Sequence, residues 1–231
     1  MGLALTERRP SPSGTTLLSC DGSSDQCAFN MTASTRPLTE QLSPDADGIA
    51  RAVGLLADGR LVAFPTETVY GLGADGRSGR AVAALYAAKG RPAFNPLIAH
   101  VPDLEAASVE GRFGDDAMRL AEVFWPGPLT LVVPCRDKGR VCDLARAGLN
   151  TIGLRAPAHH LARAILKGCG FPVVAPSANL SGRISPTEAN DVLCDLDGRI
   201  DAVVMGDRTE VGLESTIVSC LGDGPRLLRP G

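Results

Sequence analysis

Short apolar runs bounded by proline, glycine and polar residues recur along the chain, and each predicts a β-strand. The first covers residues 61–64 and ends at Pro65, which has no N–H to donate to a strand ladder. The further predicted strands cover residues 97–101, 129–133, 151–155, 172–175, 202–205, 215–219 and 226–228.

Apolar residues at helical spacing predict helices between these strands. Ile49, Val53 and Leu56 mark the first helix, with Ser43 as its expected N-cap and Pro44 at its first position. The further predicted helices lie around residues 82–86, at 115–124, at 158–167 and from 186 onward. Helices and strands alternate without a regular βαβ period, so the sequence predicts an α/β layered domain with a mixed sheet.

The N-terminal segment, residues 1–44, differs in composition from the rest of the chain. It is rich in Ser, Thr, Pro and Asp and has little apolar periodicity, so we expect it to lack stable structure. It has no apolar segment typical of a secretory signal, and Met31 could be the natural start. We expect residues 1–40 to be a disordered or mis-assigned extension and residues 41–231 to form a single domain.

Composition narrows the class of protein. The 231 residues are 44% hydrophobic, so the chain can bury a substantial core. A formal net charge of -3 and 4% aromatic residues give no strong signal for direct nucleic-acid binding. No apolar run approaches the ~20 residues of a membrane span. The seven cysteines form no CxxC pair, so we expect free thiols in a reducing cytosol rather than a zinc or redox motif.

The most informative stretch covers residues 61–100. Thr66, Glu67 and Thr68 follow the first predicted strand, and a glycine-rich turn is predicted next. That turn, at 71–76, matches GxGxxG. However, too many residues separate it from the strand, and no acidic residue follows where one would hold a ribose. A dinucleotide site is therefore not the favoured interpretation.

A basic cluster follows one helix later. Lys89 and Arg91 flank the helix end, and Asn95 lies in the proline-containing turn that would fix both cations. Such cations often only compensate a helix dipole in solvent, but a rigid turn favours a target such as phosphate oxygens. His100 ends the next strand, where ligand crevices of open α/β sheets lie, although a lone histidine there is more often a core side chain.

A further charge, Arg155, ends another apolar strand. A cation at the edge of the core needs a partner, and either Glu67 or a substrate carboxylate would serve. Glu214, Ser215 and Thr216 repeat, further along the chain, the pattern of polar groups at a strand edge.

The polar loop 175–187 supplies more hydroxyl and amide groups, among them those of Ser177 and Asn179. Ser185 with Glu188 fits a capping box for the helix that follows, so Ser185 could have this structural role alone.

Seven segments, in order along residues 45–231, resemble the threonylcarbamoyl-AMP synthase family, which has the YrdC-like fold. They are PTETVYGLGAD (65–75), KGRPAFNPLIAH (89–100), FWPGPLTLV (124–132), TIGLRAP (151–157), APSANLSG (175–182), GLESTIV (212–218) and LLRPG (227–231). Seven matches in order are far more specific than any single motif. The resemblance implies a twisted mixed α/β sheet with flanking helices around a large basic cavity.

The activity that this resemblance implies is that of an ATP-dependent nucleotidyltransferase. Such an enzyme condenses L-threonine, bicarbonate and ATP to threonylcarbamoyl-AMP and releases pyrophosphate. The product feeds the threonylcarbamoyl modification of adenosine in tRNA, so downstream tRNA-modifying proteins and a cytoplasmic location are expected. Mg²⁺ is expected on the phosphates, held mainly by substrate oxygens and water rather than by a metal site in the protein.

The resemblance also implies residue roles. Lys89 and Arg91 would be catalytic, gripping the triphosphate and offsetting charge on the α-phosphate and the leaving pyrophosphate. The other residues on the ATP side would be Asn95, Thr151, Ser177, Asn179, Ser185 and Arg229. The L-threonine side would consist of Thr68, His100, Arg155 and Ser215, with Arg155 against the carboxylate.

Two other functions stay open at this stage. One is a non-catalytic RNA-binding module that uses the same basic cleft, against which the net charge and the scarce aromatics count. The other is a transferase domain that forms carbamoyl-adenylate, against which the absence of attached zinc-finger or acylphosphatase-like regions counts. Some family members continue past the LRPG segment into a linker and a second domain, so any role of that linker would be absent here or supplied otherwise.

Overall fold

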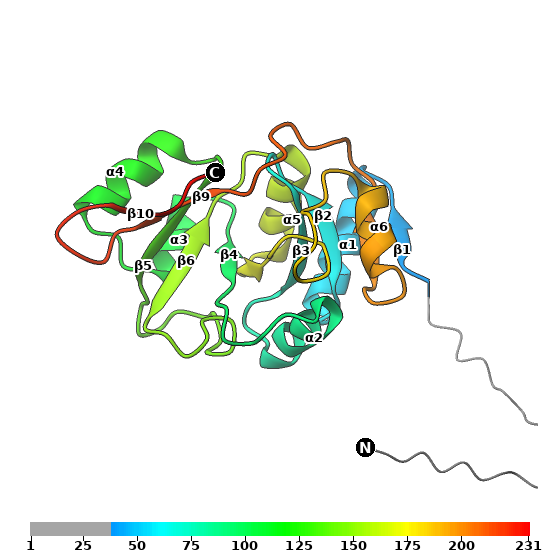
Figure 1. The fold of residues 1–231 in the computed structure, drawn as a ribbon, viewed down its shortest axis with the longest axis horizontal. Helices are drawn as coiled ribbons and strands as arrows, with labels where there is room; N and C mark the ends of the chain where they lie inside the picture. The colour runs from blue at the N-terminus through cyan, green and yellow to red at the C-terminus, as the bar shows by residue number, and fades with distance from the viewer. Residues whose placement is uncertain (1–37) are drawn as a thin grey trace, which may run out of the picture. The chain divides into compact units, whose positions relative to one another are not determined.

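The structure is a computed structural model that describes residues 38–231. In this part of the chain, ten strands form one mixed sheet that is flanked by six helices (Figure 1). The strands are β1 (Glu40–Leu42), β2 (Val62–Pro65), β3 (Tyr70–Asp75), β4 (Ile98–His100), β5 (Leu129–Pro134), β6 (Thr151–Arg155), β7 (Val173–Val174), β8 (Ala202–Val204), β9 (Thr216–Ser219) and β10 (Arg226–Arg229). The helices are α1 (Ala46–Ala57), α2 (Gly79–Lys89), α3 (Leu104–Glu110), α4 (Asp115–Phe124), α5 (His160–Cys169) and α6 (Ala189–Leu196).

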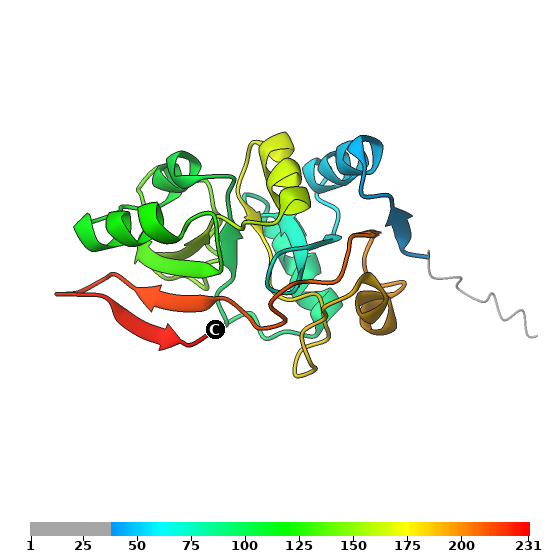
Figure 2. The same cartoon turned by 90° about the horizontal axis from the view of Figure 1, so that it is seen from above.

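The strand order is β1-β8-β2-β3-β7-β4-β6-β5-β9-β10. The sheet contains both parallel pairs (β1 with β8, β2 with β8, β4 with β6, β5 with β9) and antiparallel ones, so the predicted mixed sheet is confirmed. Helices cover both faces of this sheet (Figure 2). Mixed sheets covered on both faces bury most strands completely, which explains the continuous apolar runs of the sequence.

Two apolar clusters form the core of the described residues. One joins α1 and α5 to a sheet face through residues such as Leu56, Phe64 and Ile165. The other joins α2 and α6 to strands across the sheet through residues such as Leu85 and Leu196. No helix in the described part of the chain combines the length and the apolar character that crossing a membrane requires.

The glycine-rich segment 71–76 is not a turn, as the sequence had predicted, but belongs largely to strand β3. The strand pairs antiparallel with β2, and glycine is needed because neighbouring groups approach closely. A Cβ atom on Gly73 would lie only 2.7 Å from Phe64 Cε1 and 3.1 Å from the carbonyl oxygen of Val62. The GxGxxG match therefore reflects strand packing and not a phosphate-binding turn.

The predicted caps of two helices are wrong. Helix α1 begins at Ala46, and its N-cap is Asp45, whose Oδ1 accepts from the N–H of Gly48 at 2.9 Å. The Ser43 hydroxyl instead donates to Asp45 Oδ1 at 2.8 Å, so Ser43 stabilises the capping carboxylate and is not itself the cap. Pro44 precedes this N-cap and therefore lies outside the helix.

Helix α6 begins at Ala189, three residues later than the sequence predicted. Its N-cap is Glu188, whose N–H donates to Asp191 Oδ2 at 3.1 Å. Ser185 does not take part in the cap, because its hydroxyl donates to Glu214 Oε1 at 2.9 Å. The capping box therefore lies one turn further along the chain than predicted.

Two short elements were not predicted. Of the N-terminal segment expected to lack structure, residues 1–37 lie outside the described residues, but β1 forms at 40–42 because Leu42 is buried and pairs with β8. Helix α3 has seven residues, and Asp103 caps it by accepting from the N–H of Ala106 at 2.9 Å. Both elements are too short for a periodic signal.

Candidate active site

A cavity lies beside the carboxyl ends of two neighbouring parallel strands, β4 and β6. The strand register places His100 directly opposite Arg155 at these ends. Seven of the twelve predicted site residues line this cavity, namely Thr68, Arg91, His100, Arg155, Ser177, Ser215 and Arg229. Segments that are far apart in the sequence therefore meet at one place, as the motifs predicted.

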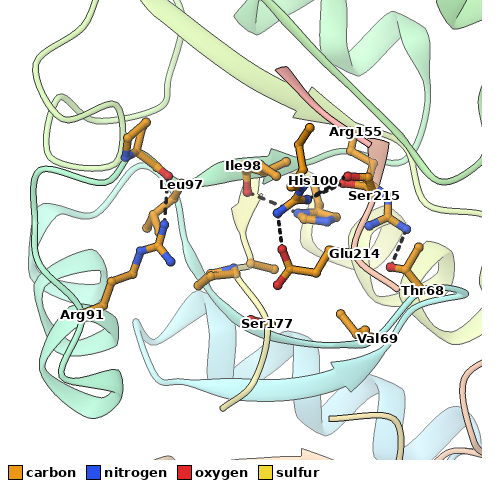
Figure 3. Close-up of a pocket in the computed structure, with 14 residues that line it drawn as sticks. Thr68, Val69, Arg91, Leu97, Ile98, His100, Arg155, Ser177, Glu214 and Ser215 are labelled. Carbon is orange, nitrogen blue, oxygen red and sulfur yellow. Dashed lines mark hydrogen bonds and ion pairs between the residues drawn. The ribbon is translucent and has the colours of Figure 1, made fainter. Parts of the chain in front are cut away.

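The cavity has two ends (Figure 3). Arg91 lies at one end, whereas His100, Arg155 and Ser215 gather at the other. One end thus offers a single guanidinium, and the other a guanidinium with an imidazole and a hydroxyl group. Such a cavity suits two ligands, or one ligand with two kinds of polar group.

Arg155 is the best-held cation of the site. Only 4% of the residue is exposed, and its Nη2 lies 2.8 Å from Glu67 Oε1 and donates to Thr68 Oγ1 at 3.0 Å. Its Nε donates to the carbonyl oxygen of Gly127 at 3.3 Å. Burial lowers the pKa of Arg155 from its usual value, and the neighbouring charge of Glu67 opposes this effect. The guanidinium remains charged, because its ordinary pKa is so high.

His100 lies beside Arg155 as a neutral ring. Burial, reinforced by the charge of Arg155, lowers the pKa of His100 to about 3. Its Nδ1 lies 3.3 Å from the carbonyl oxygen of Ile98. A ring that stays uncharged at neutral pH can donate or accept a hydrogen bond but cannot serve as a cation.

Buried hydroxyl groups complete this end of the cavity. Thr68 Oγ1 lies 2.8 Å from Thr66 Oγ1, and Ser215 Oγ lies 2.8 Å from Thr130 Oγ. The first contact lies within the loop between β2 and β3, and the second joins Ser215 to strand β5. The site can therefore bind an anion and several hydrogen-bonding groups at once.

Arg91 at the opposite end is held much less firmly. It follows the left-handed helix cap at Gly90, and the one hydrogen bond of its side chain in the described structure is a long 3.5 Å contact from Nη2 to the carbonyl oxygen of Pro96. Its buried Nε has no acceptor there. No carboxylate of the described residues pairs with it, so this guanidinium can bind an anionic ligand.

Arg229 of the last strand closes the cavity. It donates from Nη2 and Nε to the carbonyl oxygen of Ser215, at 2.8 and 3.1 Å, and forms an ion pair with Glu214. Glu214 lines the cavity as well and accepts from the Ser185 hydroxyl. The sequence marked Glu214 only as a polar residue at a strand edge, and its position inside the site was missed.

Lys89 is buried and faces the loop that carries Ser177. Its ammonium donates to the main-chain carbonyls of Ser177 and Asn179 and does not line the cavity. Burial, together with the charge of Arg91, lowers the pKa of Lys89 to about 8. In this structure Lys89 therefore fixes one wall of the site.

Four other predicted site residues lie outside the cavity lining. Asn95 accepts at its carbonyl oxygen from the Tyr86 hydroxyl at 2.9 Å, and Thr151 begins strand β6. Asn179 is buried and donates to the carbonyl oxygens of its own loop, at 2.7 and 3.0 Å. Ser185 meets the cavity only through Glu214.

The cavity is smaller than the sequence predicted. It encloses about 80 Å³, whereas pockets for small-molecule ligands usually measure ~300–1,000 Å³. Glu214 and Arg229 both line it and form an ion pair with each other, and the close-up shows the Glu214 side chain among the lining residues (Figure 3). The lining is basic as predicted, because three guanidinium groups face a single carboxylate there.

The donor set of the described residues does not form a cage for a metal ion. No group of three or more His, Cys, Asp or Glu side chains is close enough to hold one there. The one carboxylate that lines the cavity, Glu214, could add a single oxygen ligand to a metal that arrives on a substrate.

Taken together, a mixed α/β sheet and a basic cavity, in which Arg91 has no carboxylate partner among the described residues, are typical of proteins that bind small anionic ligands at strand ends. The family model for Sua5/YciO/YrdC proteins, described as "Telomere recombination", matches residues 54–231. The chain belongs to this family.

Two similar proteins carry the name threonylcarbamoyl-AMP synthase. The one from Bacillus subtilis is 48% identical over 195 residues, which are 84% of this chain and 56% of that protein. The one from Pyrococcus abyssi is 45% identical over 181 residues, which are 78% of this chain and 53% of that protein. The chain thus spans about half the length of the curated relatives it matches.

A solved structure agrees with these similarities. The crystal structure of Pyrococcus abyssi Sua5 complexed with L-threonine superposes with a TM-score of 0.80 at 42% identity. The match covers 84% of this chain and 58% of that one. The predicted fold class is confirmed.

Proposed function

We propose that this chain forms threonylcarbamoyl-AMP from L-threonine, bicarbonate and ATP, and releases pyrophosphate. One observation carries the proposal: seven residues from distant motifs line a single basic cavity in a chain 48% identical to a Bacillus subtilis threonylcarbamoyl-AMP synthase. The two ends of the cavity suit the two kinds of substrate.

The end at Arg155 would take L-threonine. A carboxylate fits against a buried guanidinium that is already fixed on two sides. Thr68, Ser215 and the neutral ring of His100 would then meet the amino and hydroxyl groups of the amino acid. The match with a Sua5 structure that contains L-threonine supports this assignment.

The end at Arg91 would take the phosphates of ATP. Arg91 has no carboxylate partner in the described structure, and Arg229 and Ser177 line the same cavity. Ser185 and Asn179 would support the phosphate channel from behind, and Asn95 and Thr151 would lie on the nucleotide side. Lys89 would either release the carbonyl groups of Ser177 and Asn179 and bind the triphosphate directly, or keep these contacts and hold the loop that lines the phosphate site.

The reaction needs positioned charges more than a nucleophilic side chain. The threonine amine attacks bicarbonate carbon, a C–N bond forms, and water leaves as the amine loses its proton. A carbamate oxygen then attacks the α-phosphorus, and the bond from that phosphorus to the bridging oxygen breaks. Arg91 and Lys89 would offset the charge that grows on the departing pyrophosphate.

Mg²⁺ is proposed as a companion of the triphosphate. When bound, it would neutralise phosphate charge, held mainly by substrate oxygens and water with at most one ligand from Glu214. The ion pair of Glu214 with Arg229 must open for this, and the same opening would enlarge the cavity for ATP.

The product would pass to proteins that modify tRNA, since an acyl-adenylate is a reactive intermediate. We place the reaction in the cytoplasm. The five cysteines of the described residues are separate thiols, which is typical of a reducing compartment.

The test is pyrophosphate release from ATP by the purified chain. We expect release to require both L-threonine and bicarbonate, and Arg91→Ala to lower the rate at least about a hundredfold with an unchanged melting temperature. Arg112→Ala removes an exposed arginine paired with Asp137 and serves as the matched control with normal turnover. Release that does not depend on L-threonine would refute the proposal, and full activity of Arg91→Ala would remove that residue from the site.

A further inference from the structure

Among the described residues, Glu67 is the one carboxylate in direct contact with Arg155, yet it does not line the cavity. Its side chain is 9% exposed, and both of its carboxylate oxygens are buried without a hydrogen-bond donor among the described residues. The ion pair with Arg155, at 2.8 Å, is therefore the one polar contact of the Glu67 side chain among the described residues. A buried carboxylate with so few partners is costly to the fold, so a role beyond packing is indicated.

The contacts of Arg155 define what Glu67 does to it. Nη2 is occupied by Glu67 and Thr68, and Nε by the carbonyl oxygen of Gly127. Nη1 has no acceptor among the described residues, and Arg155 lines the cavity. Protein groups thus bind Nη2 and Nε of the guanidinium, and Nη1 can donate to a ligand.

The backbone around Glu67 is fixed as well. Its carbonyl oxygen accepts from the N–H of Val211 at 3.0 Å, and that of Thr68 accepts from the N–H of Gly212 at 2.9 Å. These bonds hold the backbone of Glu67 in place, so its side chain reaches Arg155 from a fixed position.

Resting on the function proposed above, we propose that Glu67 is a positioning residue for recognition of the L-threonine carboxylate, and that it acts by orienting Arg155. Without Glu67, the buried guanidinium would lose its counter-ion and turn toward other acceptors. A carboxylate ligand would then meet a cation in the wrong orientation.

The test compares three variants in the pyrophosphate-release assay. Glu67→Gln keeps the size of the side chain and removes its charge, and we expect the KM for L-threonine to rise about tenfold or more while the KM for ATP stays within about twofold. Glu67→Asp keeps the charge at a longer distance and is expected to give an intermediate KM. Glu110→Gln removes another buried carboxylate in an ion pair, with Arg140 at 2.7 Å, that does not line this cavity. This control should lower the melting temperature without changing the KM for L-threonine.

A double-mutant cycle separates positioning from a general loss of structure. In an Arg155→Met background, Glu67→Gln should raise the KM for L-threonine no further, because the residue it orients is gone. A folded Glu67→Gln protein with an unchanged KM for L-threonine, an equal rise in both KM values, or additive effects in the cycle would overturn the proposal. Should Glu67→Gln not fold, Glu67→Asp decides by the same criteria. A wild-type chain with no dependence on L-threonine would instead refute the proposed function itself.

Discussion

His100 illustrates how burial sets the chemistry of a single residue. The ring is 3% exposed and lies opposite Arg155, so its pKa falls to about 3. A cationic imidazole would repel the guanidinium beside it, and the neutral ring avoids this repulsion.

Because of this shift, His100 makes stability depend on pH. In the unfolded chain the ring binds a proton near pH 6.5, whereas the folded chain binds it only near pH 3. Between these values the unfolded state holds the extra proton, so the free energy of unfolding falls as the pH falls, by up to about 1.4 kcal/mol per pH unit. Above pH 6.5 this loss disappears.

We therefore expect His100→Gln to weaken the pH dependence. Urea unfolding at pH 7, 6 and 5 should show wild-type stability dropping by about 1 kcal/mol or more beyond the drop in the variant. Parallel slopes for the two proteins would mean that His100 takes up its proton in the folded state.

At the scale of elements, strand β3 shows why glycine, which has a low β-propensity, occurs in the middle of a sheet. The strand lies between β2 and β7 in the sheet, and Gly71 also forms a bridge with Ser177, which lines the cavity. Side chains at Gly71 and Gly73 would push these neighbours apart. The packing of β3 thus determines where one wall of the cavity lies.

Two glycine-to-alanine substitutions test this account. Gly73→Ala should lower the free energy of unfolding by about 1–3 kcal/mol, because a Cβ atom there meets Phe64 and the β2 backbone. Gly54→Ala, in helix α1 with nothing within 4 Å of the added atom, should raise it by about 0.5–1 kcal/mol. Chemical denaturation measures both, and a neutral Gly73→Ala would show that β2 and β3 can separate at little cost.

Across the whole molecule, the sequence predicted elements well where a regular apolar pattern was clearly bounded by turn residues. The bounds of α4 and β6 match the predicted 115–124 and 151–155. Strand β3 was missed because glycine is depleted in strands. Its glycines are explained only by the close contacts of β3 with the strands beside it. Local pattern cannot reveal contacts of that kind.

The same limit applies to the site. Arg155 could be identified because a charge at the end of an apolar strand needs a partner. Lys89 was expected to face a ligand, but its direction depends on the loop at 177–179, which is distant in sequence. The position of Glu214 likewise depends on Arg229, which reaches it from the last strand.

Arg229 allows a test of this long-range assembly. Arg229→Met removes the contacts with Ser215 and Glu214 that join β10 to the cavity, and we expect the KM for ATP to rise about tenfold with a small change in melting temperature. Arg226→Met, on the same strand, removes an exposed arginine that has no ion pair in the described structure. Equal effects of the two substitutions on the KM for ATP would show that only the overall charge of β10 matters.

The order in which the cavity residues occur along the chain has a consequence for synthesis. Thr68, Arg91 and His100 leave the ribosome long before Ser215 and Arg229, which complete the lining of the cavity. A nascent chain can therefore fold most of its sheet before the cavity proposed to bind ATP is complete. Activity should begin abruptly during translation, once the β9–β10 hairpin has emerged from the exit tunnel and docked beside β5.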